Sequence, residues 1–202
     1  MYGGPAVYTP FLSRPYTRER QPNAILRAVP LLEALEEWAL GYEERNRYEC
    51  PGGTVVPRVN IGAIRGGEPW MILTNPEVCM LYLEIRTAPG QDGGAIRHEL
   101  RELLERCGLE GRVEQFLNRA GYEAQGIEPL AGALDEAHRF EFDTECEIAA
   151  SPETSMWRDH NVYNEMGIPA LTYGPPGSAG TGAYAVRRED LVRVARALAL
   201  CG

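Results

Sequence analysis

Residues 55–90 decide the fold, and their sequence is VVPRVNIGAIRGGEPWMILTNPEVCMLYLEIRTAPG. The first part, Val55–Ile64, is rich in β-branched residues and is followed by the turn signal Gly66–Gly67, so it predicts a strand. The last part, Cys79–Arg86, alternates with a period of two, which predicts a half-buried strand. One face has Cys79, Leu81, Leu83 and Ile85, and the other has Met80, Tyr82, Glu84 and Arg86. The sequence of Thr87–Gly90, with its Pro and Gly, ends that strand.

Arg86 is placed at the end of the second predicted strand. A strand is a rigid support, and a guanidinium group can bind a carboxylate through two parallel hydrogen bonds. The simpler alternative is a solvated charge at a strand end. Composition alone favours that alternative, because most arginines at a protein surface are only solvated.

A helix is predicted on each side of the two strands. Asn23 can cap a helix over residues 24–44, where apolar residues recur at helical spacing. Pro30 is expected to kink this helix or to divide it. Asp92 can cap a second helix that ends at Gly108.

Further, weaker strands are expected at residues 6–9, 113–117 and 124–127. The resulting order is strand, helix, strand, strand, helix, strand. It predicts an α+β domain with the ferredoxin-like βαββαβ topology, in which an antiparallel sheet carries both helices on one face.

The composition changes near residues 128–130, so we expect a first domain over residues 1–130 and a second segment over residues 131–202. The second segment alternates predicted helices and strands, as in an α/β layer. The helices are expected at residues 130–140, 161–166 and 188–200, and the strands at 145–150 and 167–173. Because this segment is too small to bury a full sheet, it is expected to be part of a larger α/β domain.

Charge and composition exclude several classes of protein. The formal net charge of -9 argues against a nucleic-acid binder, and no apolar run is long enough to cross a membrane. All 20 basic residues are Arg, so this sequence has no lysine for Schiff-base or phosphate-loop chemistry. Five cysteines lie far apart and are expected to be reduced thiols of a cytoplasmic protein: Cys50, Cys79, Cys107, Cys146 and Cys201.

The three histidines do not form a metal-binding motif. His98 and His138 are expected on helices, as solvated or packing residues. His160 follows Asp159 in a polar loop before a predicted strand, which is a reasonable position for a site. The residues alone therefore predict a fold and a few candidate positions, but no reaction.

Several short segments occur in the order that they have in one enzyme family. The chain resembles the C-terminal part of the zinc aminoacylases and peptidases that include acetylornithine deacetylase, succinyl-diaminopimelate desuccinylase and carboxypeptidase G. The matching segments are Ser13–Pro15 with Gln21–Ile25, Val59–Gly67, Leu83–Arg86, Thr154–Asn161, Gly167–Pro169, Tyr173–Pro175 and Asp190–Leu191. The resemblance implies a ferredoxin-like lid, or dimerisation, domain followed by the end of a catalytic domain.

The resemblance also implies a chemistry and a set of binding residues. Members of the family use zinc, or cobalt, to activate the water that attacks the amide of a small substrate with a free carboxylate. Arg86 resembles the clamp for that carboxylate. Leu73 occupies the position of the lid asparagine, with Asn75 close by, and Asp159 matches a loop position near the substrate. A homodimer formed through the lid domain is expected.

Other family positions differ. Phe11, Gly180 and Tyr184 stand where the resemblance places a lid histidine, the last metal ligand and a glutamate. The first metal ligands and the catalytic glutamate pair belong to segments upstream of the lid. We therefore expect no catalytic residue and no metal ligand in this chain, and no tight metal binding by it alone. A non-catalytic dimerisation or carboxylate-binding module, and a regulatory ferredoxin-like domain, are the alternatives.

Overall fold

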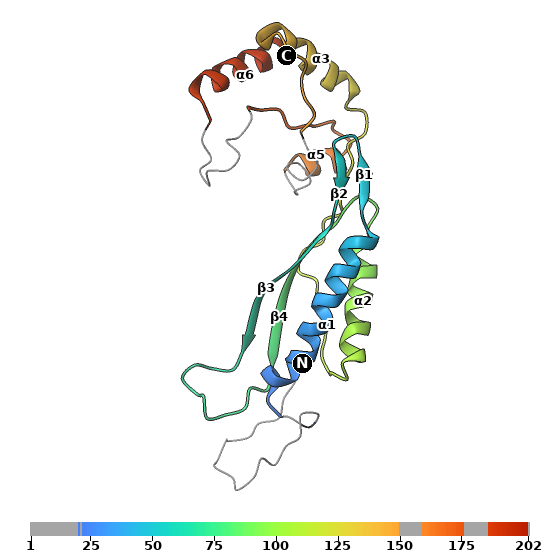
Figure 1. Ribbon diagram of the computed structural model, residues 1–202, viewed down its shortest axis with the longest axis vertical. Helices are drawn as coiled ribbons and strands as arrows, with labels where there is room; N and C mark the ends of the chain where they lie inside the picture. The colour runs from blue at the N-terminus through green and yellow to red at the C-terminus, as the bar shows by residue number, and fades with distance from the viewer. Residues whose placement is uncertain (1–19, 21, 150–158, 176–185, 202) are drawn as a thin grey trace. The chain divides into compact units, whose positions relative to one another are not determined.

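The computed structural model describes residues 20, 22–149, 159–175 and 186–201 (Figure 1). Contacts between residues divide the chain into two compact units. Unit 1 comprises Met1–Glu49 and Thr54–Gly121, and unit 2 comprises Cys50–Gly53 and Tyr122–Gly202. Within the described ranges, no helix combines the length and the apolar character that crossing a membrane requires.

The centre of unit 1 is an antiparallel pair of strands, β3 (Arg58–Gly66) and β4 (Cys79–Arg86). The bounds of β4 are those predicted from its alternating sequence. The first strand begins later than predicted because Pro57, which is fully buried, has no N–H group to give to a ladder. The residues before it form a separate two-stranded sheet from β1 (Tyr48–Cys50) and β2 (Gly53–Val55).

Both predicted helices of unit 1 are present, and their caps are those expected from the sequence. The Asn23 side chain accepts the N–H groups of Ile25 and Leu26 at the start of α1 (Ala24–Arg45). The Asp92 side chain does the same for the first turn of α2 (Gly93–Arg106). The expectation that Pro30 would divide the first helix is wrong, because α1 continues through it.

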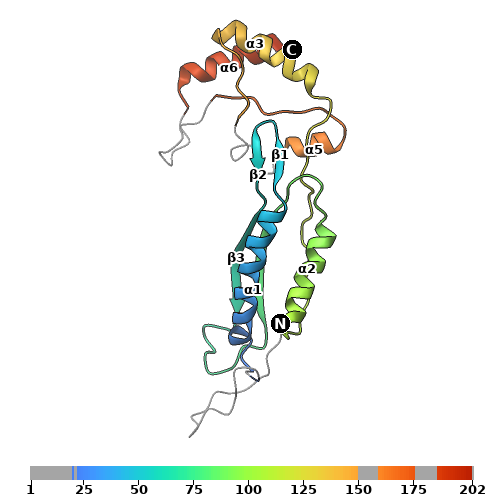
Figure 2. The same ribbon diagram turned by 45° about the vertical axis from the view of Figure 1, so that its right-hand side comes forward.

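The two helices lie side by side on one face of the β3–β4 pair (Figure 2). Nine buried side chains of α1 and α2 form the core between them: Leu31, Leu35, Trp38, Ala39, Tyr42, Ile96, Leu100, Leu103 and Leu104. The inward residues of the strands pack against this cluster, namely Val59, Ile61, Leu81, Leu83 and Ile85. An antiparallel sheet with helices on one face confirms the α+β class of this unit.

The predicted four-stranded sheet is not seen in the part of the chain that the structure describes. There, β3 pairs with β4 alone, and the expected strand at residues 6–9 lies outside the described residues. The strands expected at 113–117 and 124–127 are wrong, since neither segment is extended in a ladder. Phe116 and Leu117 are exposed, and Gly121 makes a single parallel bridge with Pro89.

Two glycines explain the path of this segment. Residues 109–121 return along α2, where a Cβ on Gly93 would lie 2.5 Å from the Asn118 side chain. The segment then meets the end of β4, and a Cβ on Gly121 would lie 2.3 Å from the carbonyl carbon of Ala88. The segment is thus held by close backbone contacts and by packing on α2, and it does not join the sheet.

In unit 2, the predicted helices are confirmed as α3 (Glu128–Phe142), α5 (His160–Glu165) and α6 (Arg188–Cys201). The helices α3 and α6 pack against each other. The predicted strand at 167–173 is wrong, because the buried Asn164 side chain binds both the N–H and the C=O group of Ala170, at 2.9 and 3.1 Å. The described part of the strand expected at 145–150 is also irregular.

Candidate functional site

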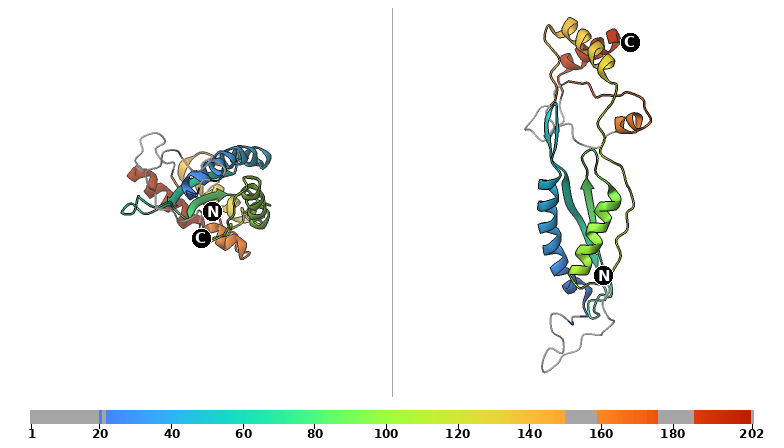
Figure 3. Two further views of the ribbon diagram at one scale, coloured as in Figure 1. Left: turned by 90° about the horizontal axis from the view of Figure 1, so that it is seen from below. Right: turned by 90° about the vertical axis from the view of Figure 1, so that its right-hand side faces the viewer.

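The face of the β3–β4 pair that points away from the helices is polar. Successive residues of a strand point to opposite faces. The residues next in sequence to the core residues Val59 and Ile85 therefore belong to this outer face. Figure 3 shows α1 and α2 together on the other side of the strands. The outer face carries Arg58, Asn60, Ala63 and Arg65 from β3, and Met80, Tyr82, Glu84 and Arg86 from β4.

Arg86 is held at the end of β4 by the nearest carboxylate on its own strand. Its Nε and Nη2 atoms both donate to Oε1 of Glu84, at 3.2 and 2.9 Å. The Arg86 side chain is 37% exposed and that of Glu84 is 59% exposed, so this ion pair is a surface pair of small net stability. One edge of the guanidinium group is used by Glu84, and the remaining N–H groups are available to a ligand.

Asn75 lies far from Arg86. It is buried just before β4, beside Pro76, whose carbonyl accepts the Ala24 N–H group at 2.9 Å. Arg86 is at the opposite end of the same strand, and eight strand residues at about 3.3 Å each separate the two positions by roughly 25 Å. The structure therefore does not bring these two predicted site residues together.

Asp159 is in unit 2, directly before α5. Its side chain is exposed and does not cap the helix, while its carbonyl accepts the Val162 N–H group at 3.0 Å. The neighbouring His160 contacts the Thr172 hydroxyl through Nδ1 at 3.1 Å. Asp159 is thus an accessible carboxylate on a short helix, in a different unit from Arg86 and Asn75.

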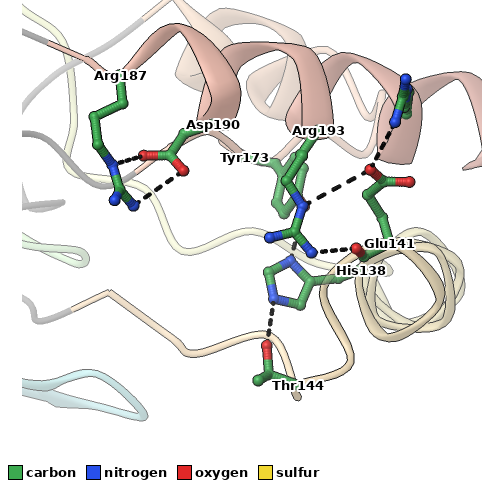
Figure 4. Close-up of polar contacts among 8 residues, drawn as sticks. His138, Glu141, Thr144, Tyr173, Arg187, Asp190 and Arg193 are labelled. Carbon is green, nitrogen blue, oxygen red and sulfur yellow. Dashed lines mark hydrogen bonds and ion pairs between the residues drawn. The ribbon is translucent and has the colours of Figure 1, made fainter.

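A polar cluster that sequence analysis did not identify is centred on His138 of α3 (Figure 4). Its Nδ1 atom lies 2.8 Å from the Tyr173 hydroxyl, and its Nε2 atom lies 3.3 Å from the Thr144 hydroxyl. The His138 ring also stacks on Phe142, with 4.5 Å between the ring centroids. Burial, followed by the nearby Cys146, raises the pKa of the Tyr173 hydroxyl.

The same cluster joins α3 to α6. The guanidinium group of Arg193 lies 4.2 Å from the centroid of the Phe142 ring and donates to the carbonyl of Glu141. The Glu141 carboxylate also faces Arg193 and Arg196, at 3.8 and 3.5 Å. At the start of α6, Arg187 pairs with Asp190 (Figure 4). The contacts of Arg193 and Arg196 with Glu141 hold the two helices together.

The sequence offered only a partial signal for this cluster. His138 and Phe142 are four residues apart on a predicted helix, which places them on one face. Tyr173 is 35 residues away in sequence from His138, so its contact depends on the tertiary structure. Within the described ranges, no three His, Cys, Asp or Glu side chains gather in a way that could hold a metal ion.

Comparison with known proteins identifies relatives of unit 1. Residues 14–112 match the family described as the peptidase dimerisation domain of M20 peptidases. Among solved structures, an M20 family metallo-carboxypeptidase from Sulfolobus solfataricus superposes with a TM-score of 0.53 at 16% sequence identity. The superposition covers 72% of this chain and 35% of that chain, so the present chain spans about a third of that enzyme.

Proposed function

We propose that the chain is the lid and C-terminal portion of a metal-dependent amidohydrolase or peptidase, because residues 14–112 match the M20 peptidase dimerisation family. The substrate class is a small N-acyl amino acid or peptide with a free carboxylate. Unit 1 covers the substrate and pairs subunits, and residues 131–202 are the end of the catalytic domain. The family match over unit 1, with Arg86 at the end of an ordered strand, carries this proposal.

The proposed role of Arg86 is to bind the substrate carboxylate. Its backbone is fixed by pairing with β3, and Glu84 orients one edge of its guanidinium group. A charged pair between guanidinium and carboxylate groups is short and directional, so it can position a small substrate. Asp159 and Asn75 are two further proposed substrate contacts. Asp159 is accessible, whereas Asn75 is buried.

Metal chemistry has to come from outside the described residues of this chain. In the family, zinc or cobalt would supply an activated water. No group of side chains among the described residues provides the ligands for such an ion. The five cysteines are free, in agreement with a reducing compartment, and we propose a cytoplasmic location.

The proposed homodimer uses unit 1. In the described residues, the outer edge of β3 has no strand beside it, and unpaired edges favour strand addition. The loop between β3 and β4 also exposes four consecutive apolar side chains. Trp70, Met71, Ile72 and Leu73 are 80%, 54%, 82% and 66% exposed. Such a run is costly in water and is typical of a surface that another protein covers.

The carboxylate-binding role can be tested on the isolated chain by NMR titration with N-acetylalanine. The ester of the same compound, N-acetylalanine methyl ester, has no negative charge and is the matched control ligand. We expect the acid to shift resonances at the end of β4 and the ester to leave them unchanged. The Arg86→Gln variant should lose the response to the acid. Equal responses to the acid and the ester would contradict the proposal.

A second candidate function is a non-catalytic dimerisation or carboxylate-binding module. The exposed Leu73, at the position of the lid asparagine, favours it because an alkyl side chain cannot hydrogen-bond a substrate. The two functions differ in their dependence on Arg86. If a catalytic partner chain is active with this chain, Arg86→Ala should lower its kcat/KM under the first proposal. An unchanged kcat/KM would favour the second.

A further inference from the structure

Arg58 lies directly across from Arg86 on the neighbouring strand. Residues opposite each other in an antiparallel pair have Cβ atoms about 4.5–5.5 Å apart and point to the same face. Two like charges at such positions repel each other, so the pair costs stability unless an anion lies between them. The sequence did not show this pairing, because it depends on the register of the two strands.

The charges on this end of the outer face are unbalanced. Glu84 already binds Arg86, whereas the exposed Arg58 has no hydrogen bond or ion pair with any residue in the described ranges. The local sum is one positive charge, in a chain whose formal net charge is -9. The third arginine of this face, Arg65, lies at the other end of β3, with its guanidinium group 6.0 Å from the centroid of the Tyr82 ring.

The backbone of Arg58 is fixed from both sides. Pro57, before it, is fully buried, and the N–H group of Val59, after it, donates to Oε1 of Glu43 at 2.8 Å. A guanidinium group on such a support loses less freedom when it binds an anion than one on a flexible loop. Arg58 is therefore positioned for binding and is not the tip of a loose segment.

We propose that Arg58 and Arg86 together bind one carboxylate group of the ligand, an inference that rests on the carboxylate-binding role proposed above. Glu84 accepts hydrogen bonds from the edge of Arg86 formed by Nε and Nη2. The ligand carboxylate therefore accepts hydrogen bonds from the other N–H groups of Arg86 and from the guanidinium group of Arg58. One carboxylate neutralises the site. The site therefore favours a ligand with a single carboxylate over a dicarboxylate of the same size.

The test is an NMR titration of the full-length chain with N-acetylalanine and with N-acetylaspartate. We compare the unmodified chain with Arg58→Gln, Arg86→Gln and the double variant, and Arg65→Gln is the matched control on the same face. Loss of one charge-assisted contact should weaken N-acetylalanine binding about tenfold in Arg58→Gln. Arg65→Gln should bind as the unmodified chain does, and N-acetylaspartate should bind more weakly than N-acetylalanine.

The outcomes separate this inference from the proposed function. If Arg86→Gln loses binding and Arg58→Gln does not, the inference is overturned and the role of Arg86 stands. If neither variant changes binding, or the unmodified chain does not bind the acid, both fail. Equal losses in Arg58→Gln and Arg65→Gln would show a general effect of positive charge and would also overturn the inference. The backbone spectrum of each variant checks that β3 and β4 are intact, and Arg58→Lys replaces Arg58→Gln if they are not.

Discussion

Units 1 and 2 are stabilised in different ways. Unit 1 has a continuous apolar core of nine side chains between two helices and two strands. In unit 2, the described residues bury only four apolar side chains, and Arg193 of α6 makes polar contacts with Glu141 and Phe142 of α3. Unit 2 also exposes large apolar side chains, namely Phe140, Ile148, Met166, Ile168 and Leu198.

Unit 1 is the more self-sufficient part of the chain. Both units expose large apolar side chains, so the contrast lies in their cores. A unit with a continuous apolar core can fold alone, while a segment that buries few apolar side chains normally packs against further structure. This contrast agrees with the proposal that unit 1 is the lid and that residues 131–202 are part of a larger domain.

The largest effect is expected from Leu103→Ala in the core of unit 1. Leu103 is 4% exposed, and truncation of a buried leucine costs about 2–5 kcal/mol. Val194→Ala in α6 removes fewer buried carbon atoms and should cost less. Hydrogen exchange in each unit measures both effects. If Leu103→Ala lowers protection equally in α3 and α6, the two units unfold together and the contrast is wrong.

Alkaline pH should destabilise unit 1 through Tyr42. Burial, with a further contribution from Glu99 and opposed by Arg45, raises the pKa of this hydroxyl to about 12. The unfolded state therefore loses the proton near pH 10 and the folded state near pH 12. The stabilisation that comes from this difference in the pKa of Tyr42 is fully present below pH 10 and is lost as the pH rises through about 12. Its upper limit is about 2–3 kcal/mol.

Tyr42→Phe is the matched variant, and urea unfolding between pH 9 and 12 measures the effect. The pH dependence specific to Tyr42 is the difference between the unmodified chain and this variant, because other groups titrate in both. Tyr42→Phe also loses the hydrogen bond to Gln91, which lowers stability at every pH. Parallel stability curves for the two proteins would contradict the prediction.

Gly121→Ala should destabilise unit 1 by about 1–3 kcal/mol, because its Cβ would overlap the backbone of Ala88. Gly132→Ala is the control in unit 2. Gly132 lies inside α3 with no heavy atom within 4 Å of the added Cβ, so the alanine should stabilise that helix by up to about 1 kcal/mol. Urea unfolding of both variants should show opposite signs, and the same sign would contradict the account.

The smallest effect is expected from Tyr173→Phe in unit 2. The substitution removes the hydrogen bond to His138, which contributes about 1 kcal/mol. Tyr163→Phe, at an exposed position on α5, is the control and should be neutral. Protection of α3 amides measures the change. If Tyr173→Phe leaves α3 protection unchanged, the polar cluster does not hold this helix.

The elements that sequence analysis predicted well are those with a local cause. The alternation of Cys79–Arg86 fixed β4, and Asn23 and Asp92 marked the helix starts because their side chains bind the first free N–H groups. The start of β3 also has a local cause, because Pro57 has no N–H group for the ladder. The segments of the resemblance that lie within residues 14–112 agree with the family match over that range.

The errors have tertiary causes. Residues 113–117 have strand-like composition, but they pack along α2, where no strand is available to pair with them. Residues 167–173 have the composition of a buried strand. The Asn164 side chain, however, forms hydrogen bonds with the N–H and C=O groups of Ala170 that a neighbouring strand would otherwise bind. The position of Arg58 opposite Arg86 depends on strand register, which a sequence pattern does not specify across a loop of this length.

The most direct test of the central claim, that unit 1 pairs subunits, is the mass of the chain in solution by sedimentation equilibrium. If unit 1 pairs two subunits, the measured mass is twice the chain mass of 22.4 kDa. Trp70→Glu, which places a charge on the exposed apolar loop, should shift this mass toward that of one chain if the loop lies in the interface. A mass of 22.4 kDa for the unmodified chain at every concentration would contradict the claim.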